Sequence, residues 1–461
     1  MNWSLTDDPS DGESADGMFW LPADAGTRVA GRLRMSRRYG PWIALRGSLE
    51  GEVSEGYAPY PRIDGNVNGR AVVLLDAGQL SEPIFTLDNQ LVGANHAVIG
   101  WSDEQIGDAF KVSIVEMSGL NEWLGYHPIR YDVPNEVKPG LTTGRIEFVQ
   151  PEQPSVSLSD GTELRVRVGP GLKSSRYEAS LRLVSRLEVT LSKPGTASTH
   201  FSHARRFRDF MAFCTEYAVQ VTDAQLMKQQ YEPGGPVGEP PMDWWARWNE
   251  PGPSPEDAPS WTHMNFLVRE HINEWSQMVT TWFDKWAILR DPVELLLSLT
   301  FAPPTYWDTR LLLVCSAAEA YHRASIGSER WTKVEFRNRR RMVLEGIPEA
   351  ERQWVSEATR YANEPTLRSR LLDLQDRSNS ALPMLFDRHP DWAKVTSKMR
   401  NDYAHRGKSK KATHPPDEIF RAVEVTARVV RTCILLDLGL PANDLAMTYV
   451  GRPDYIRLVR D

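Results

Sequence analysis

Hydrophobic and polar residues alternate in short runs through the first half of the chain, from about residue 18 to residue 192. The runs are TRVAGRLRM, WIALRGSLEG, RAVVLLDAG, FKVSIVEM, RIEFVQ, SVSLSDGTELRVRV and SRLEVTLS. Gly, Pro, Asp or Asn residues separate them, and Asp160-Gly161 between two runs is a hairpin signal. Alternation with a period of two is typical of half-buried β-strands. The pattern predicts an antiparallel β-sandwich or barrel-like domain.

The period becomes helical after residue 200. Apolar residues recur at helical spacing at Phe207, Phe210, Met211, Cys214 and Ala218, and again at Ile272, Trp275, Val279, Trp282 and Trp286. Further helices are expected over 308–323, 330–345, 349–362, 366–378, 390–406 and 416–438. The last one opens on Pro-Pro-Asp-Glu and closes at Gly439. We therefore expect an α+β multidomain protein, in which a β-rich N-terminal domain precedes an all-α helical bundle.

Two segments follow neither period. Residues 1–17 are acidic and polar and are predicted to form a disordered tail. Residues 231–260 are rich in Pro and Gly and are predicted to be an exposed loop without a long helix or a central strand, its WWARW cluster pinned against a neighbouring surface. The expected parts are the tail at 1–17, a β-rich domain with a terminal helix at 18–230, the loop at 231–260, connecting helices at 261–304 and a helical domain at 305–461.

Composition excludes several classes of protein. Of the 461 residues, 41% are hydrophobic and 25% charged, which is typical of a globular chain. No apolar run approaches the roughly 18–20 residues that span a bilayer, and the N-terminus lacks the basic and apolar regions of a secretory signal. The three cysteines are far apart and form no CxxC pair. We expect a cytoplasmic protein without a disulfide scaffold, a zinc ribbon or contact with a membrane.

Charge is divided unevenly along the chain. The formal net charge is −7, but residues 301–461 contain 27 Lys and Arg against 21 Asp and Glu, a net of +6. The remainder holds 27 basic and 40 acidic residues, a net of −13. A basic C-terminal part could bind a polyanion, whereas two domains with ordinary surfaces would explain the same numbers.

Common nucleotide and metal motifs are absent from the sequence. GPGLKSS, at 169–175, lacks the glycine directly before the lysine of a phosphate-binding loop and is predicted to be a turn between strands. His200 and His203 have no recognisable third metal ligand and are expected to be surface histidines. The sequence contains no HExxH and no GxSxG. We therefore expect neither a metal nor a cofactor.

The segment 394–411 combines a histidine with many cations. Arg400 and His405 are surrounded by Lys394, Lys398, Arg406, Lys408, Lys410 and Lys411. Metal-free RNA cleavage needs proton carriers for the 2′-OH and the 5′-oxygen, which His suits, and a fixed cation for the phosphorane, which Arg suits. Positions five apart on a helix point about 140° away from each other, so a bend or a second copy would have to bring the pair together. A basic helix C-terminus capped by Gly407 is the simpler alternative.

The pair also resembles a family signature. Arg400-Asn-Asp-Tyr-Ala-His405 is similar to the Arg-x(4–6)-His motif of the HEPN superfamily, and the upstream helix LLLVCSAAEAYHR resembles the family's preceding helix with its polar residue, here Glu319. FWLPADAGTRVAGRL, WIALRG, LVGANHAVIG and FKVSIVEMSGLNEWLG resemble the β-rich N-terminal domain of ApeA-type anti-phage proteins. The resemblance covers roughly residues 18–440 and implies that an Apea-like HEPN domain follows a β-rich sensing domain.

The resemblance implies a role for particular residues. Arg400 and His405 would be the catalytic pair and Asn401 a supporting polar group. Glu319 would orient one of the pair, or would form an i, i+4 pair with Arg323 on its own helix. His322 would be a second proton carrier or a buried structural histidine. The candidate RNA-binding residues are Lys398, Arg406, Lys408, Lys410 and Lys411, and the basic run at 333–341 could line an RNA groove or form a solvated helix face.

Three functions remain open at this stage. The first is an anti-phage effector, a metal-independent endoribonuclease that forms a homodimer or a higher oligomer and stays inactive until the N-terminal domain binds a phage-derived trigger. The second is a non-catalytic HEPN protein that binds RNA or nucleotides or mediates assembly. The third assigns the function to the N-terminal half as a binding domain, with exposed Trp244, Trp245 and Trp248 as its marker.

Overall fold

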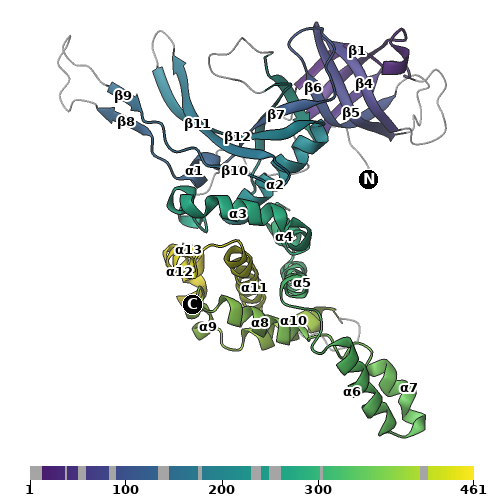
Figure 1. Ribbon diagram of the computed structural model, residues 1–461, viewed down its shortest axis with the longest axis vertical. Helices are drawn as coiled ribbons and strands as arrows, with labels where there is room; N and C mark the ends of the chain where they lie inside the picture. Colours follow the sequence, from purple (N-terminus) through teal and green to yellow (C-terminus); the bar gives the residue numbers. More distant parts are fainter. Residues whose placement is uncertain are drawn as a thin grey trace. The chain divides into compact units, whose positions relative to one another are not determined.

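The structure, a computed structural model, describes residues 13–36, 39–49, 59–81, 90–132, 145–174, 179–229, 240–248, 261–301, 305–404 and 414–460. The chain divides into two compact units (Figure 1). The β-rich unit consists of Met1–Met211 and Ala218–Ala258, and the helical unit of Ala212–Tyr217 and Pro259–Asp461. The short segment Ala212–Tyr217 therefore belongs to the helical unit, although the chain on both sides of it belongs to the β-rich unit.

The β-rich unit is built from antiparallel strands. Within its described residues these are β1 (Glu13–Trp20), β2 (Val29–Ser36), β3 (Gly40–Leu45), β4 (Pro59–Val67), β5 (Arg70–Ser81), β6 (Leu91–Ile99), β7 (Phe110–Met117), β8 (Ile129–Asp132), β9 (Arg145–Phe148), β10 (Ser155–Ser157), β11 (Glu163–Ser174), β12 (Ala179–Gly195), β13 (Val221–Met227) and β14 (Met242–Ala246). The 3-10 helix η1 (Pro22–Asp24) and the helices α1 (Leu120–Leu124) and α2 (Ala197–Thr215) accompany them. β8 and β9 form a separate hairpin.

Six strands close into a barrel. Their order is β6-β3-β2-β1-β4-β5, and β5 pairs back onto β6, for example Val73 with Val98. Closure leaves these strands no free edge. The alternating apolar positions point into a common core, in which Phe19, Leu33 and Ile43 are fully buried. The prediction of an antiparallel, barrel-like N-terminal domain is confirmed.

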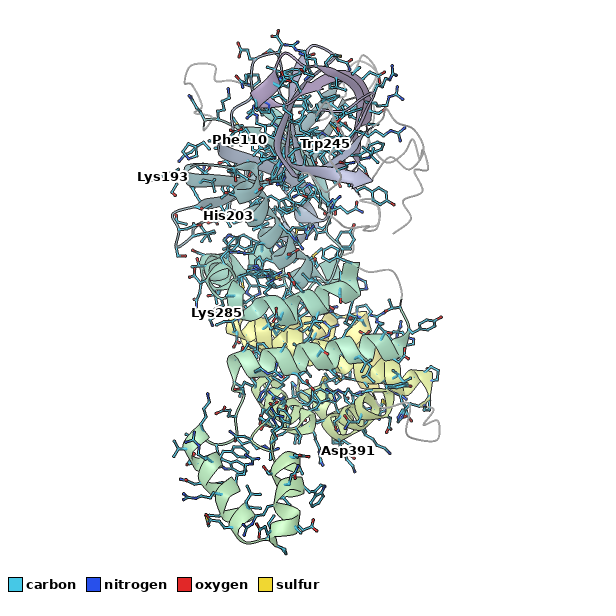
Figure 2. The ribbon with its side chains drawn as sticks, turned by 90° about the vertical axis from the view of Figure 1, so that its right-hand side faces the viewer. Phe110, Lys193, His203, Trp245, Lys285 and Asp391 are labelled. Atoms are coloured by element: carbon cyan, nitrogen blue, oxygen red, sulfur yellow. The ribbon has the colours of Figure 1, made fainter. Side chains whose placement is uncertain are left out.

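The sheet continues beyond the barrel through β14, β13, β7, β12, β11 and β10. Phe110, at the start of β7, is fully buried in this part (Figure 2). β11 and β12 pair over their whole overlap, from Glu163 opposite Thr190 to Ser174 opposite Ala179. GPGLKSS is therefore strand and not a turn up to Ser174, since β11 runs through it. The Asp160-Gly161 hairpin is confirmed: it joins β10 to β11, and Gly161 has a φ of +80°.

The predicted exposed loop at 231–260 contains a central strand. β14 pairs with β13 on one side and with β6 on the other, so this part of the prediction is wrong. The prolines and glycines flank the strand, whereas MDWWA itself contains none and alternates inward and outward positions. Trp244 and Trp248 are buried and their rings meet edge to face, with centroids 5.5 Å apart. They are core residues and not the exposed marker of a binding domain.

Two further expectations change in the β-rich unit. β1 begins at Glu13, so the predicted disordered tail is wrong for 13–17, and 1–12 lie outside the described residues.

His200 is not a surface histidine but is fully buried on α2. One ring nitrogen lies 3.1 Å from the Ser113 hydroxyl and the other 3.0 Å from the Phe110 carbonyl oxygen. Burial lowers the pKa of His200 to about 4, so this ring is neutral and joins α2 to β7.

The helical unit contains the remaining elements. Within its described residues these are the 3-10 helices η3 (Trp261–His263) and η4 (Val268–His271), and the helices α3 (Ile272–Asp284), α4 (Trp286–Phe301), α5 (Trp307–Ser325), α6 (Lys333–Glu345), α7 (Glu349–Ala358), α8 (Leu367–Ser378), α9 (Pro383–Arg388), α10 (Trp392–Ala404), α11 (Pro416–Asp437), α12 (Ala442–Gly451) and α13 (Pro453–Arg460). The predicted all-α C-terminal region is confirmed. None of these helices combines the length and the apolar character needed to cross a bilayer.

α11 is the central helix of this unit. It packs against α5, α8 and α10, and most of its residues from Ile419 to Leu435 are buried. α5 contributes an apolar face that includes Leu311, Val314 and Ala318. α6 and α7 are different, because neither contains a buried residue. Packing among α5, α8, α10 and α11 positions the polar residues of the candidate site, and α4 packs against α5.

A buried charge cluster fixes the segment Ala212–Tyr217 inside the helical unit. The arginine cluster comprises Glu216, Arg428, Arg431, Arg452 and Asp454. Glu216, just after α2, has a φ of +56° and its carboxylate lies 2.6 Å from Arg428 Nη1 and 2.9 Å from Arg452 Nη1, and also pairs with Arg431. Burial alone would raise the pKa of Glu216, but the three arginines hold it well below its usual range. Ion pairs therefore link the residue after α2 to Arg428 and Arg431 on α11 and to Arg452, which directly precedes α13.

Candidate functional site

α10 presents Arg400 next to α5. The buried residues of α10 are Trp392, Ala393, Thr396 and Met399, and their spacing places them on one face of the helix. Asp391, marked in Figure 2, directly precedes this helix. Arg400 follows the last buried residue, and its side chain is 31% exposed. Packing therefore holds its backbone, while solvent can reach its guanidinium.

Two side chains orient the guanidinium. Arg400 Nη2 donates to Glu319 Oε1 on α5 at 2.9 Å, and Nη1 donates to Asn401 Oδ1 at 3.2 Å. The side chain of Glu319 is 25% exposed, so this ion pair lies at the border between core and solvent. Of the pairings left open for Glu319, the structure has the one with Arg400. Asn401, the expected supporting polar group, contacts Arg400 through this hydrogen bond, and its role stays a prediction.

His322 lies one helical turn beyond Glu319 on α5 and is buried. Its Nε2 is 2.7 Å from Asp373 Oδ2, and its Nδ1 is 3.2 Å from Arg370 Nη1, both on α8. Arginine only donates, so Nδ1 accepts and Nε2 carries a proton that it donates to Asp373. Both ring nitrogens are occupied, which favours the structural role for His322 over that of a proton carrier.

A second histidine, His414, contacts the last turn of α10. His414 Nε2 is 3.0 Å from Asp402 Oδ2, and its ring lies 5.8 Å from the ring of Tyr403. This contact joins the last turn of α10 to the residue that precedes the start of α11 by two positions. Lys398, one of the expected RNA-binding residues, is exposed on α10. His405, Arg406, Lys408, Lys410 and Lys411 lie outside the described residues.

Other chemistry is less suited to this region. Burial raises the pKa of Cys315 to about 12 although the charge of Arg400 opposes the shift, and burial also raises the pKa of Cys433 to about 12. Cys214 is buried and its pKa is raised well above the usual value. These thiols are protonated at neutral pH and are poor nucleophiles. Across the described ranges, no group of three or more His, Cys, Asp and Glu side chains could hold a metal ion.

Comparison with known families identifies both halves of the chain. The model of ApeA N-terminal domain 1 matches residues 14–282, more than half of the sequence, and that of the Apea-like HEPN matches residues 312–444. The chain belongs to the ApeA family. The HEPN match includes Glu319, Arg400 and His405, the residues on which the resemblance was based. No curated protein and no solved structure matches the sequence.

The family membership confirms the expected ApeA-type defence protein, in which a HEPN domain of nuclease type follows a β-rich domain. The ApeA N-terminal match reaches residue 282 and so includes β14 and most of α3, whereas the predicted β-rich domain ended at 230. The HEPN match begins within α5 and ends early in α12. The Arg400–Glu319 pair therefore lies within the HEPN domain.

Sequence reasoning missed four polar residues of this region: Arg370, Asp373, Asp402 and His414. Arg370 and Asp373 are three positions apart on α8, a spacing that places them on one helix face. That spacing alone does not tell which helix they meet, because charged residues three apart are common on solvated helices. The signal for His414 was its place directly after the basic segment, followed by Pro-Pro.

Proposed function

We propose that the HEPN domain of this ApeA-type protein is a metal-independent endoribonuclease, with Arg400 and His405 as its catalytic pair. The observation that carries the proposal is the state of Arg400: Glu319 and Asn401 hold its guanidinium in place, yet nearly a third of the side chain stays open to solvent. A permanent cation with forked donors, fixed in advance and accessible, suits a phosphate that gains charge during a reaction.

The chemistry is transesterification. The 2′-oxygen of a ribose attacks the adjacent phosphorus, the bond to the 5′-oxygen breaks, and the products are a 2′,3′-cyclic phosphate and a 5′-OH. His405 takes the proton from the 2′-OH or gives one to the 5′-oxygen, which an imidazole can do near pH 7. Arg400 stabilises the phosphorane. The Asp402–His414 contact joins two described residues that precede and follow 405–413 in the sequence.

One imidazole cannot act as base and acid in the same step, so the reaction needs a second proton carrier. His322 is buried with both ring nitrogens bonded and is poorly placed for this role. We therefore propose a homodimer, in which a second copy of the chain supplies the second imidazole. Binding of a phage component by the β-rich domain would then control whether two HEPN domains meet productively.

The test uses cells that carry the wild-type protein or its variants, with and without phage. Discrete RNA fragments with 2′,3′-cyclic phosphate ends are expected only in infected wild-type cells and not with Arg400→Ala or His405→Ala. Arg457→Ala, which removes an exposed arginine on α13, is the matched control and should cleave like the wild type. Cleavage by purified, activated protein should persist in EDTA. Phage protection with intact RNA in both site variants would refute the nuclease and favour a non-catalytic HEPN protein.

A further inference from the structure

α6 and α7 form a helical hairpin that stands apart from the other helices of its unit (Figure 1). Its base is closed by Asn363, whose side chain accepts from the Trp331 backbone N–H at 3.0 Å and donates to the Trp331 carbonyl at 3.0 Å. A capping box between Thr332 and Glu335 starts α6. Local hydrogen bonds thus maintain the hairpin, although α6 and α7 contain no buried residue. The surface of the hairpin is therefore open to solvent and to a ligand.

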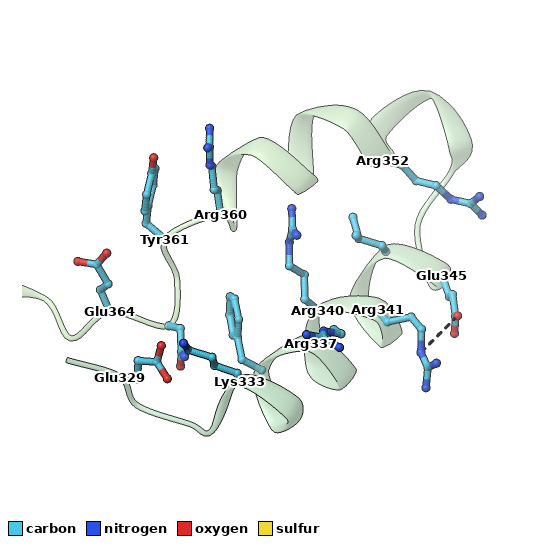
Figure 3. Close-up of a pocket in the computed structure, with 13 residues that line it drawn as sticks. Glu329, Lys333, Arg337, Arg340, Arg341, Glu345, Arg352, Arg360, Tyr361 and Glu364 are labelled. Atoms are coloured by element: carbon cyan, nitrogen blue, oxygen red, sulfur yellow. Dashed lines mark ion pairs between the residues drawn. The ribbon is translucent and has the colours of Figure 1, made fainter. Parts of the chain in front are cut away.

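A groove of about 640 Å³ runs along this hairpin (Figure 3). Its volume is within the roughly 300–1,000 Å³ range of ligand pockets. The charged residues that line it are Lys333, Arg337, Arg340, Arg341, Arg352, Arg360, Glu329, Glu345 and Glu364. Six cations against three carboxylates leave a net charge of +3 in the groove, whereas residues 329–364 as a whole have a net charge of only +1. Positive charge is therefore concentrated on the groove.

The arginines of the groove have two different roles. Arg340 crosses from α6 to α7, where its Nη2 donates to the Ser356 carbonyl at 2.6 Å and its Nε to Thr359 Oγ1 at 3.2 Å, so it fixes the hairpin. Arg337 and Arg352 are exposed and have no hydrogen bond or ion pair with any described residue. In Figure 3 they come from different helices, and their unpaired guanidinium groups are available to an anion.

Aromatic side chains accompany these charges. Tyr361 is 66% exposed, and the Arg360 guanidinium carbon lies 5.4 Å from its ring centroid. Phe336 also lines the groove. A free aromatic face can stack on an unpaired base, and an arginine plane can stack beside it, whereas the bases of a duplex are inaccessible. The combination of forked cations and an open aromatic ring favours a single-stranded nucleic acid over an acidic peptide.

The groove also borders the Arg400 region. Glu364, at its rim, lies 3.9 Å from Arg370 Nη2, and Arg370 Nη1 donates to His322 on the helix that carries Glu319. An RNA strand bound in the groove would contact Glu364, whose partner Arg370 contacts the helix that carries Glu319, and would share no residue with the candidate site. We propose that the groove between α6 and α7 binds single-stranded RNA and holds a substrate whose cleavage takes place at Arg400. The choice of RNA rests on the proposed function.

Binding is measured by fluorescence anisotropy with the full chain and a labelled 2′-O-methyl oligouridine, which lacks the attacking 2′-OH. Arg337→Ala/Arg352→Ala should weaken binding and reduce the slope of log affinity against log salt by roughly 1.4, since each phosphate contact on a single strand contributes about 0.7. Arg368→Ala/Arg457→Ala removes two exposed arginines outside the groove and should leave affinity and slope unchanged. Tyr361→Leu should weaken oligouridine binding but not that of inorganic polyphosphate, which has no base to stack.

Other results would overturn the inference. Equal affinity and slope in the groove variant and its control would exclude the groove as an RNA site. If Arg337→Ala/Arg352→Ala weakens the binding of polyglutamate and of oligouridine equally, and Tyr361→Leu affects neither, the groove is instead a site for an acidic peptide. If Arg400→Ala abolishes cleavage while the groove variant binds RNA normally, the proposed nuclease activity stands and only the RNA-binding groove is refuted. Groove binding without any cleavage by the wild type would refute only the nuclease.

Discussion

Replacing Glu216 by Gln tests whether the arginine cluster holds the helical unit together. The carboxylate of Glu216 pairs with Arg428, Arg431 and Arg452, whose side chains are 3%, 6% and 3% exposed. Gln keeps the shape and one acceptor oxygen but removes the charge. Asp454 still pairs with Arg428 and Arg452, at 2.5 and 2.8 Å, so the greatest loss falls on Arg431.

The expected loss of stability follows from this geometry. Removing one partner of a buried ion pair costs about 3–5 kcal/mol, because the remaining charge has no compensation. The Glu216 side chain is 20% exposed, so water reaches it and the loss should be near the lower end, about 3 kcal/mol. At 1.4 kcal/mol per factor of ten, opening of the surrounding helices becomes roughly 100-fold more frequent. Glu216→Gln is expected to destabilise the helical unit at every pH at which Glu216 is ionised in the wild type.

Hydrogen exchange followed by mass spectrometry measures this effect on α11 alone, which matters because two compact units need not unfold together. Peptides from Pro416–Asp437 should exchange roughly 100-fold faster in Glu216→Gln. Glu418→Gln removes the same charge from an exposed position on α11 and should change the stability by less than about 1 kcal/mol. Glu216→Gln/Arg431→Met should recover much of the protection, since the uncompensated cation is gone. Unchanged exchange in the single variant, or strictly additive losses in the double one, would refute the reasoning.

Two further results are expected. Glu319→Gln weakens the ion pair that orients Arg400, so kcat for RNA cleavage should fall roughly tenfold with little change in KM. The melting temperature should change little, because solvent can reach the side chain at position 319. An unchanged kcat would show that this pairing does not position Arg400. His200 has a pKa of about 4 when folded and about 6.5 when unfolded, so the unfolded state binds the extra proton and stability falls by up to roughly 3 kcal/mol as the pH drops from about 6.5 to 4. His200→Gln should flatten the pH dependence of the melting temperature of the β-rich unit, whereas the exposed His127→Gln should leave it as steep as before.

Local patterns were sufficient wherever the element is decided by its own residues. The alternation in FKVSIVEM predicts β7, and the turn signal Asp160-Gly161 predicts the hairpin between β10 and β11. The helical period and its end signals predict α11 within one residue. They failed where composition over a long window hid a short element, as at β14, whose five residues contain no Pro or Gly although their surroundings are rich in both.

The sequence alone determined the two-part organisation of this ApeA-type protein, the family signature around Arg400 and His405, and the absence of common metal and nucleotide motifs. It did so because periodicity, turn chemistry and a short motif are properties of neighbouring residues. Tertiary structure alone decided which helices meet: that Glu319 pairs with Arg400, 81 positions away, that His322 is enclosed by α8, and that Glu216 lies among three arginines. Such pairings depend on packing between distant segments, and many charged residues along the chain would satisfy the same local rules.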